Sequence, residues 1–207
     1  MSTLWEETDE DYLNLIKDWT DPYPNPEIIK HDGIHVVRDD LLNAGSKVRF
    51  IDYLISSNKE INEWVFGSCP ATGYAQISLP IACKKHNKKA VLFMAKRDEK
   101  NLTEYQKRGI ELGVDYHWVE NGMLTVTQKR AKDYAAESSD RMVLPLGLEH
   151  PSVLGSIIKV ARSLPITPDE VWTVGSSGTL NRGLQFAWPH ATIHVVSVGH
   201  TMNEREI

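Results

Sequence analysis

From residue 34 onward, short apolar segments alternate regularly with helical patterns, and this alternation is the strongest constraint on the fold. Most of the apolar segments are continuous runs, which is typical of strands that are covered on both faces. Strands alternating with helices predict an α/β fold with a mainly parallel sheet in a three-layer α/β/α arrangement. We expect strands at Ile34–Val37, Trp64–Phe66, Ala90–Met94, His117–Val119, Met142–Leu144, Val171–Val174 and Ile193–Val198, and helices near 47–57, 73–86, 101–112, 124–136, 152–163 and 180–187.

The composition is that of a globular protein. Hydrophobic residues make up 41% and charged residues 25% of the 207 residues, which excludes a largely disordered chain. No apolar run approaches the roughly 18 residues that a membrane span needs, and the first residues lack the features of a secretory signal. The two cysteines, Cys69 and Cys83, offer neither a disulfide framework nor a four-ligand zinc pattern. We therefore expect a cytoplasmic protein without membrane contact.

The net charge of −5 is spread unevenly along the chain. Residues 1–32 hold nine acidic and two basic side chains and are predicted to form a peripheral acidic arm, with a short helix that ends at the DPYPNP stretch. Residues 84–132 hold twelve basic and six acidic side chains. Such a segment is able to meet nucleic acid, but its aromatic residues do not alternate with the basic ones in a stacking pattern. Solvated helix faces are the favoured interpretation, and nucleic acid is possible as a partner but not indicated.

In a parallel sheet, ligands bind beyond the carboxyl ends of the strands, where glycine-rich turns open the following helices. The clearest such turn follows the strand Val171–Val174 and contains Gly175, Ser176, Ser177, Gly178 and Thr179. Its glycines allow successive N–H groups to face one point, and the hydroxyls and the helix N-terminus add donors for an anion. The turn is predicted to hold a phosphate, although a simple capped turn is the alternative. It lacks the lysine of a Walker loop.

A second polar turn, Asn43 to Ser46, leads into a helix whose first residue is Lys47. The helix dipole and partial desolvation would both lower the pKa of this amine and favour the neutral form that a Schiff base needs. The alternative is an ordinary solvated lysine.

The third turn follows the strand Trp64–Phe66 and runs through Ser68, Cys69, Thr72 and Gly73 into a helix of small residues. A turn of this kind at a helix start suits a carboxylate as well as a phosphate. Cys69 is a weaker candidate for a nucleophile, because a helix start lowers the pKa of a thiol but no neighbouring histidine supports it. A plain strand-to-helix connection remains the alternative.

Together the three turns resemble the fold type II pyridoxal-phosphate enzymes, especially the D-cysteine desulfhydrase and aminocyclopropane-carboxylate deaminase branch. The sequence RDDLLNAGSKVR at 38–49 is similar to that branch's strand, turn and Lys-x-Arg helix start, and GSSGT at 175–179 is similar to the family's phosphate cup. The segment LPLGLEHPSVLGSIIKVA at 144–161 also has a counterpart. The resemblance spans roughly residues 34–198.

This resemblance implies pyridoxal 5'-phosphate as cofactor and a lyase or transferase that acts on a small amino acid by elimination, replacement or deamination at the β-carbon. Lys47 is implied as the Schiff-base lysine, residues 175–179 as the phosphate site, and Ser68, Thr72 and Gly73 as contacts of the substrate carboxylate. It further implies a homodimer and two lobes. We expect an arm at 1–32, a larger cofactor lobe from 33–60 and 146–207, and a smaller inserted lobe at 61–145.

The sequence departs from the family pattern in two ways. The stretch from Pro70 to Gly73 offers no Asn for the cofactor's ring hydroxyl, and the chain is short for the family. The alternative function is therefore a non-catalytic or repurposed relative that binds a phosphorylated small molecule or nucleotide, with a role in nucleic-acid metabolism left open. A metal enzyme is a third, weaker idea, because the spacing of His190, His194 and His200 matches no standard ligand pattern.

Overall fold

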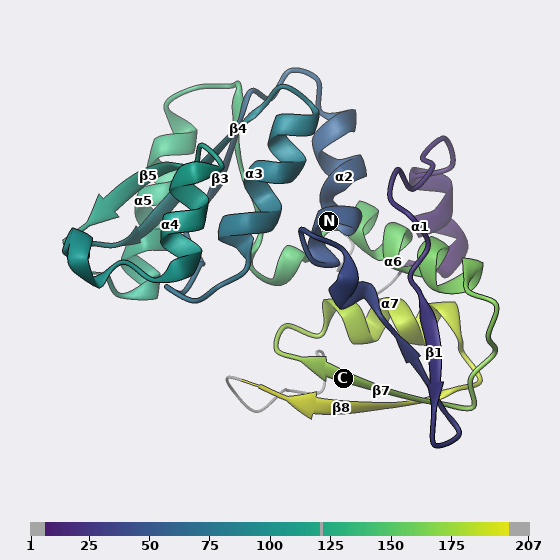
Figure 1. Cartoon of the computed structure of the whole chain (residues 1–207). Helices are drawn as coiled ribbons and strands as arrows, with labels where there is room; N and C mark the ends of the chain where they lie inside the picture. Colours follow the sequence, from purple (N-terminus) through teal and green to yellow (C-terminus); the bar gives the residue numbers. More distant parts are fainter. Residues whose placement is uncertain (1–6, 121, 199–207) are drawn as a thin grey trace. The chain divides into compact units, whose positions relative to one another are not determined.

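A computed structural model describes residues 7–120 and 122–198, which form two compact units (Figure 1). The first unit takes in the described parts of Met1–Leu41 and Pro145–Ile207, and the second unit is Leu42–Leu144. The first contains α1 (Asp9–Leu15), β1 (Ile28–His31), β2 (Ile34–Val37), η1 (Asp39–Leu41), η3 (Leu146–Leu148), α6 (Pro151–Ser163), β7 (Glu170–Gly175), α7 (Thr179–Ala187) and β8 (Thr192–Ser197). The second contains α2 (Lys47–Ser57), β3 (Glu63–Phe66), α3 (Ala75–Lys85), β4 (Lys89–Ala95), η2 (Glu99–Asn101), α4 (Glu104–Glu111), β5 (Asp115–Val119), α5 (Leu124–Ala136) and β6 (Arg141–Val143).

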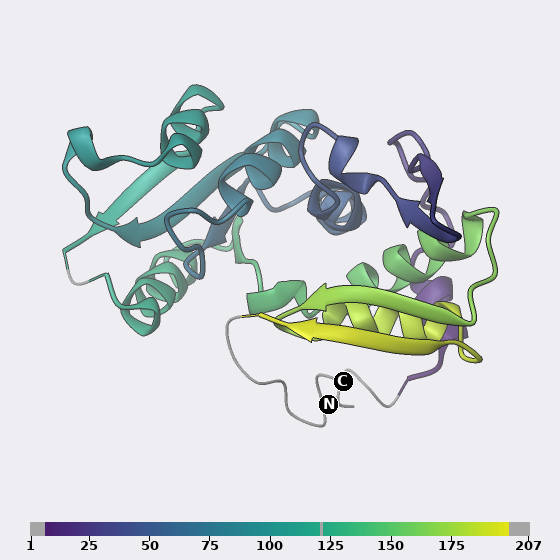
Figure 2. The same cartoon turned by 60° about the horizontal axis from the view of Figure 1, so that its bottom comes forward.

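The second unit is built on a four-stranded parallel sheet in the order β5-β4-β3-β6, flanked by helices on both faces (Figure 2). Tyr116 of β5 lies on one face, where its hydroxyl donates a hydrogen bond to Gln76 of α3 at 3.0 Å. The next residue, His117, lies on the other face with Phe93, and both rings contact Tyr134 of α5. Burial on both faces explains why β3 and β4 are continuous apolar runs in the sequence. The predicted α/β class is confirmed.

The strand order of this sheet reverses between β3 and β6. From β3 the chain proceeds outward through α3 and α4 to β4 and β5, and then returns through α5 to place β6 on the other side of β3. In an open parallel sheet, such a reversal opens a crevice at the carboxyl ends of the two strands concerned, where ligands bind. The segment that begins at Gly67 leaves β3 at this point.

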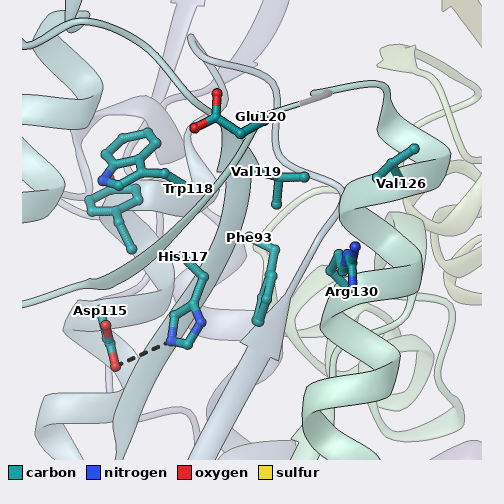
Figure 3. A pocket seen from close by; sticks show the side chains of 9 residues that line it. Phe93, Asp115, His117, Trp118, Val119, Glu120, Val126 and Arg130 are labelled. Atoms are coloured by element: carbon teal, nitrogen blue, oxygen red, sulfur yellow. Dashed lines mark ion pairs between the residues drawn. The ribbon is translucent and has the colours of Figure 1, made fainter.

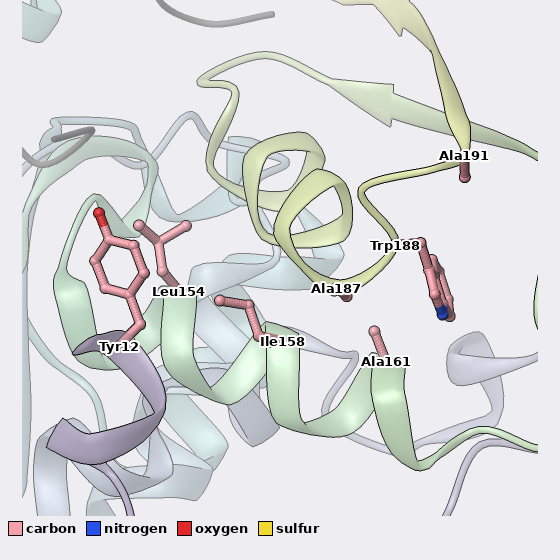
Figure 4. Close-up of a cluster of buried hydrophobic side chains, with 7 residues drawn as sticks. All are labelled: Tyr12, Leu154, Ile158, Ala161, Ala187, Trp188 and Ala191. Atoms are coloured by element: carbon pink, nitrogen blue, oxygen red, sulfur yellow. The ribbon is translucent and has the colours of Figure 1, made fainter. Parts of the chain in front are cut away.

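The core of the first unit lies around α6 (Figure 4). Leu154 and Ile158 of α6 are fully buried against Tyr12 of α1 and against residues from the end of α7 and the start of β8. The helix begins at Pro151, directly after His150, whose imidazole accepts a hydrogen bond from the Ser152 N–H at 3.2 Å. Proline is favoured at the first position of a helix because that position needs no N–H donor.

The N-terminal segment is part of this core, which corrects the expectation of a peripheral arm. A side-chain carbon at Gly155 would lie 2.5 Å from the Tyr12 carbonyl oxygen, so α1 and α6 approach each other closely. Trp19, which follows α1, is only 5% exposed, and its carbonyl accepts a hydrogen bond from Lys159 of α6.

The remaining strands form two small sheets in the first unit. β7 and β8 pair in parallel and are joined by α7, while β1 and β2 form an antiparallel hairpin through Asp32 and Gly33. The sequence predicted Ile34–Val37 correctly as a strand, but its side chains are exposed rather than covered on both faces. One face of the β7–β8 pair is also open, with Trp172 70% exposed.

The division into units differs from the one expected from the sequence at one point. Residues 42–60 belong to the second unit because α2 packs on α3. The sequence analysis expected residues 33–60 to form one lobe with residues 146–207. Among the described residues, no helix has the length and apolar character needed to cross a bilayer.

Candidate functional site

One buried side chain, that of Gln76, joins the loop after β3 to the first turn of α3 through hydrogen bonds. The amide nitrogen of Gln76, which is fully buried, donates to the carbonyl oxygens of Ala71 and Gly73 at 3.0 Å each. The Thr103 hydroxyl donates to the Ala71 carbonyl at 2.7 Å from the start of α4. The carbonyls of the loop are therefore turned inward, and the loop has a fixed shape. No local sequence pattern marks Gln76, because its role depends on contacts that form only in the folded chain.

Gly73 is required at its position by close packing. A side-chain carbon there would lie 2.7 Å from the Cys69 sulfur and 2.9 Å from the Pro70 ring. Its N–H already donates to the Pro70 carbonyl at 2.8 Å. Gly73 therefore shapes the loop sterically, while its own amide is used inside the loop.

The loop also carries two hydroxyls, those of Ser68 and Thr72, which the sequence predicts as contacts of a substrate carboxylate. The Ser68 oxygen accepts a hydrogen bond from the Gln128 amide of α5 at 2.9 Å, which leaves the Ser68 proton free to donate. Thr72 is exposed, and no hydrogen bond of its hydroxyl is recorded within 7–120 and 122–198. Gln128 is a second positioning residue that the sequence did not single out.

Lys47 is the first residue of α2, as predicted, and its side chain is exposed. Within its unit this exposure does not provide the burial that the expected partial desolvation needs. Its ammonium group is close enough to Cys69 to lower the pKa of that thiol slightly. The preceding turn contains Gly45 at φ +68°, and a side-chain carbon there would lie 2.9 Å from the ring of Tyr74. Tyr74 therefore lies beside the turn that precedes Lys47, and no sequence pattern marks it for this position.

Cys69 is not suited to act as a nucleophile. It is 7% exposed, and burial raises the pKa of its thiol to about 11, against smaller opposing effects from the N–H groups of Gln76 and Ala75 and from Lys47. At neutral pH the thiol is therefore protonated. The N–H groups at the start of α3 lower the pKa of the Cys69 thiol, as expected, but burial raises it by more. The expectation that the helix start makes this thiol reactive is therefore wrong.

The turn from Gly175 to Thr179 lies in the first unit and connects β7 to α7. Gly178 adopts φ +79°, a left-handed conformation that favours glycine, and caps the helix. Among the described residues, the N–H groups of Ser176, Ser177 and Gly178 have no recorded backbone acceptor. These N–H groups lie at the start of α7, where the sequence predicts a turn that binds an anion. We refer to residues 175–179 as the phosphate cup.

A second glycine turn packs against the phosphate cup. Gly147 of η3 has φ +67°, and a side-chain carbon there would lie 2.2 Å from Cβ of Ser177. The Ser177 hydroxyl is 3.4 Å from both the Gly147 carbonyl oxygen and the Thr179 hydroxyl. The glycine-rich stretch before α6 therefore supports the cup, and the cup has hydroxyl and N–H donors without a lysine or arginine of its own.

The histidines singled out from the sequence give no metal site among the described residues. His194 lies in β8, as expected, where its ring stacks on Trp172 with the centroids 4.3 Å apart. His190 is exposed at the turn before β8, and His200 lies outside the described residues.

Comparison with solved structures identifies the fold. No protein-family model matches the sequence, and no curated protein matches it. Structural similarity to fold type II pyridoxal-phosphate enzymes nevertheless extends over about nine-tenths of the chain. The chain therefore has the fold of this class, as its three turns predicted.

Three solved structures illustrate the similarity. An aminocyclopropane-carboxylate (ACC) deaminase homologue matches with a TM-score of 0.76 at 16% identity, over 93% of this chain and 67% of its own. The processed form of threonine deaminase isoform 2 from Solanum lycopersicum matches with a TM-score of 0.72 at 17% identity, over 91% and 55%. Maize serine racemase matches with a TM-score of 0.70 at 14% identity, over 91% and 60%. The present chain thus spans between just over half and two-thirds of the length of these proteins.

Proposed function

We propose that this chain is a pyridoxal-phosphate-dependent enzyme that acts on a small amino acid by elimination, replacement or deamination at the β-carbon. The observation that carries the proposal is the glycine-lined phosphate cup, which occurs in a chain that shares its fold with an ACC deaminase homologue and a threonine deaminase. Lys47 lies in the second unit and the cup in the first.

The residues of the cup suit the phosphate group of this cofactor. Three N–H groups at the start of α7 lack recorded acceptors among the described residues, and the glycine conformations at 147 and 178 keep side chains out of the cradle. The helix N-terminus favours the negative charge. Ser177 and Thr179 add hydroxyl donors.

The loop after β3 suits the substrate. The Ser68 and Thr72 hydroxyls donate to the substrate carboxylate, while Gly73 and Gln76 fix the shape of the loop that carries them. When bound, the cofactor supplies the electron sink for a reaction at the substrate α-carbon. Lys47 would hold the cofactor through Nζ, and its amine would move the proton at that carbon.

A second candidate function is a repurposed relative that binds a phosphorylated small molecule or a nucleotide without catalysis. Two observations favour it. Lys47 is exposed rather than desolvated, and 67% or less of each compared relative has a counterpart in this chain. In this alternative the phosphate cup binds its ligand without covalent help from Lys47.

The two functions are separated by titrating the full chain with pyridoxal 5'-phosphate and recording absorbance and binding together. We expect the long-wavelength band of lysine-bound cofactor in the wild type and its loss in Lys47→Ala, with Lys59→Ala as an exposed lysine control from the same unit. Gly178→Val should weaken binding, because valine disfavours the left-handed backbone that the cup requires.

Binding of equal strength in the wild type and in Lys47→Ala, without the band in either, would support the non-catalytic alternative. A chain that binds neither pyridoxal 5'-phosphate nor inorganic phosphate contradicts both candidate functions. The predicted homodimer and the choice among β-carbon reactions stay predictions.

A further inference from the structure

A groove runs along the edge strand of the second unit, between β5 and α5 (Figure 3). Its volume is about 530 Å³, within the range of small-molecule sites. None of its residues belongs to the turns discussed above. We call it the β5 groove, and it is lined by Phe93, Asp115, Tyr116, His117, Trp118, Val119, Glu120, Val126 and Arg130.

The inner wall of the β5 groove is formed by rings and aliphatic side chains. Phe93 of β4 is 6% exposed, and its ring lies 4.5 Å from the His117 ring, centroid to centroid. Both rings pack against Tyr134. Val119 and Val126 add apolar lining. His117 is the accessible ring of this wall, with 34% of its side chain exposed, and it offers a planar group on which a ligand ring is able to stack.

His117 presents one ring nitrogen to the groove. Its Nε2 lies 3.6 Å from the Asp115 carboxylate. In Figure 3 the other ring nitrogen, Nδ1, is turned toward the side of Phe93 and Arg130. No hydrogen bond from Nδ1 is recorded within the described part of the chain. In the tautomer that carries its proton on Nε2, Nδ1 is an acceptor for a ligand N–H or O–H.

Arg130 supplies a cation without a partner. It projects from the side of α5 that faces Phe93 (Figure 3), and no ion pair or hydrogen bond of its guanidinium is recorded among the described residues. By contrast, Arg108 and Arg141 are paired with carboxylates. The other carboxylate of the groove, that of Glu120, is paired with Lys96. The groove therefore combines one free guanidinium, one oriented acceptor and an apolar wall.

We propose that the β5 groove binds a small organic anion that carries a flat aromatic ring with an N–H donor. The ring lies against His117, Val119 and Val126, the anionic group pairs with the Arg130 guanidinium, and the N–H donates to Nδ1 of His117. A cationic ligand would be repelled by Arg130. The proposal is independent of the proposed function, since the β5 groove shares no residue with the phosphate cup or the loop after β3.

The test is a titration of the full chain with indole-3-acetate, followed by the backbone amide signals of an isotope-labelled sample. We expect saturable shifts on β5 and on the first half of α5. Arg130→Gln should weaken binding about tenfold or more, because it removes a charged hydrogen bond. Lys132→Gln, a matched change at an exposed position of the same helix outside the groove, should leave affinity unchanged. Acetate and indole should each bind more weakly than indole-3-acetate.

Three results would overturn the proposal: no saturable shifts, shifts that cluster away from β5 and α5, or equal affinities for wild type and Arg130→Gln. Arg130 is exposed, so its replacement leaves the fold intact. Titration of Lys47→Ala separates the two sites. Unchanged affinity in this variant keeps the ligand in the β5 groove, and lost affinity would assign it to the Lys47 turn instead.

Discussion

At the residue scale, the imidazole of His150 caps α6 in its neutral form. Its Nδ1 accepts from the Ser152 N–H, and burial lowers the pKa of His150 below its ordinary value near 6.5. A lowered pKa in the folded state means that the unfolded chain binds the proton more readily. The stability that this cap contributes is therefore present above about pH 6.5 and declines as the pH falls through the window below it.

We accordingly predict that the free energy of unfolding of the wild type falls between pH 7 and pH 5, and that His150→Asn makes this decline shallower. Asparagine is also a good helix cap but does not titrate in this range. The measurement is denaturant unfolding at a series of pH values. An identical decline in both proteins would show that His150 is not the group responsible.

Cys69 gives a second prediction at the residue scale. Because burial raises the pKa of its thiol to about 11, the reactive thiolate is scarce at pH 8. Iodoacetamide should therefore alkylate Cys69 in the folded chain at least roughly a hundredfold more slowly than it alkylates free cysteine, whose pKa is about 8.5. Mass spectrometry of the folded and the denatured chain checks this. Fast alkylation of the folded chain at Cys69 would restore the cysteine as a candidate nucleophile.

At the element scale, the close approach of α1 and α6 depends on Gly155. A side chain there would meet the Tyr12 carbonyl at 2.5 Å, and a backbone oxygen has little freedom to move away. Gly155→Val should therefore lower the free energy of unfolding by about 1–3 kcal/mol, the usual effect of overpacking. Thermal unfolding provides the measurement.

Gly155→Ala serves as the graded comparison, because alanine adds the offending carbon but favours the helix by about 1 kcal/mol over glycine. It should be less destabilising than Gly155→Val. If the valine variant unfolds at the same temperature as the wild type, α1 does not pack on α6 as described.

The elements themselves could largely be predicted from the sequence. The helix over 47–57 and the one over 124–136 were predicted at the bounds that α2 and α5 have in the structure, because apolar periodicity and flanking turns mark both. The strand Ile28–His31 was missed, although the Asp32-Gly33 pair between two apolar segments is a strong hairpin signal. The same pair also indicates that Ile34–Val37 is one strand of a hairpin.

The site was less predictable than the elements, for a physical reason. Glycines at 73 and 178 are visible in the sequence because each marks a turn before a helix. The side chains that hold these turns are distant or unmarked: Gln76 reaches back to the loop carbonyls, and Gln128 reaches Ser68 from a helix 60 residues away in the sequence. Their roles arise from tertiary packing, which local sequence periodicity does not encode.

At the scale of the whole molecule, the chain combines the fold of a pyridoxal-phosphate enzyme with a site that departs from the expected pattern. Residues 175–179 start α7 with a glycine in the left-handed conformation, whereas Lys47 is exposed and Tyr74 lies beside its turn. One face of the β7–β8 pair is open, with Trp172 and Val174 both more than half exposed, whereas parallel strands are usually covered on both faces. The proposed enzyme and its non-catalytic alternative differ in the role of Lys47, so experiments on this residue distinguish them.

The most direct measurement is borohydride reduction of the full chain after incubation with pyridoxal 5'-phosphate, followed by peptide mapping. The account predicts that the reduced cofactor is attached to Lys47 in nearly every modified molecule, and that Lys47→Ala is left unlabelled under the same conditions. Label spread over several exposed lysines, or label of equal extent in Lys47→Ala, would contradict the central role of Lys47.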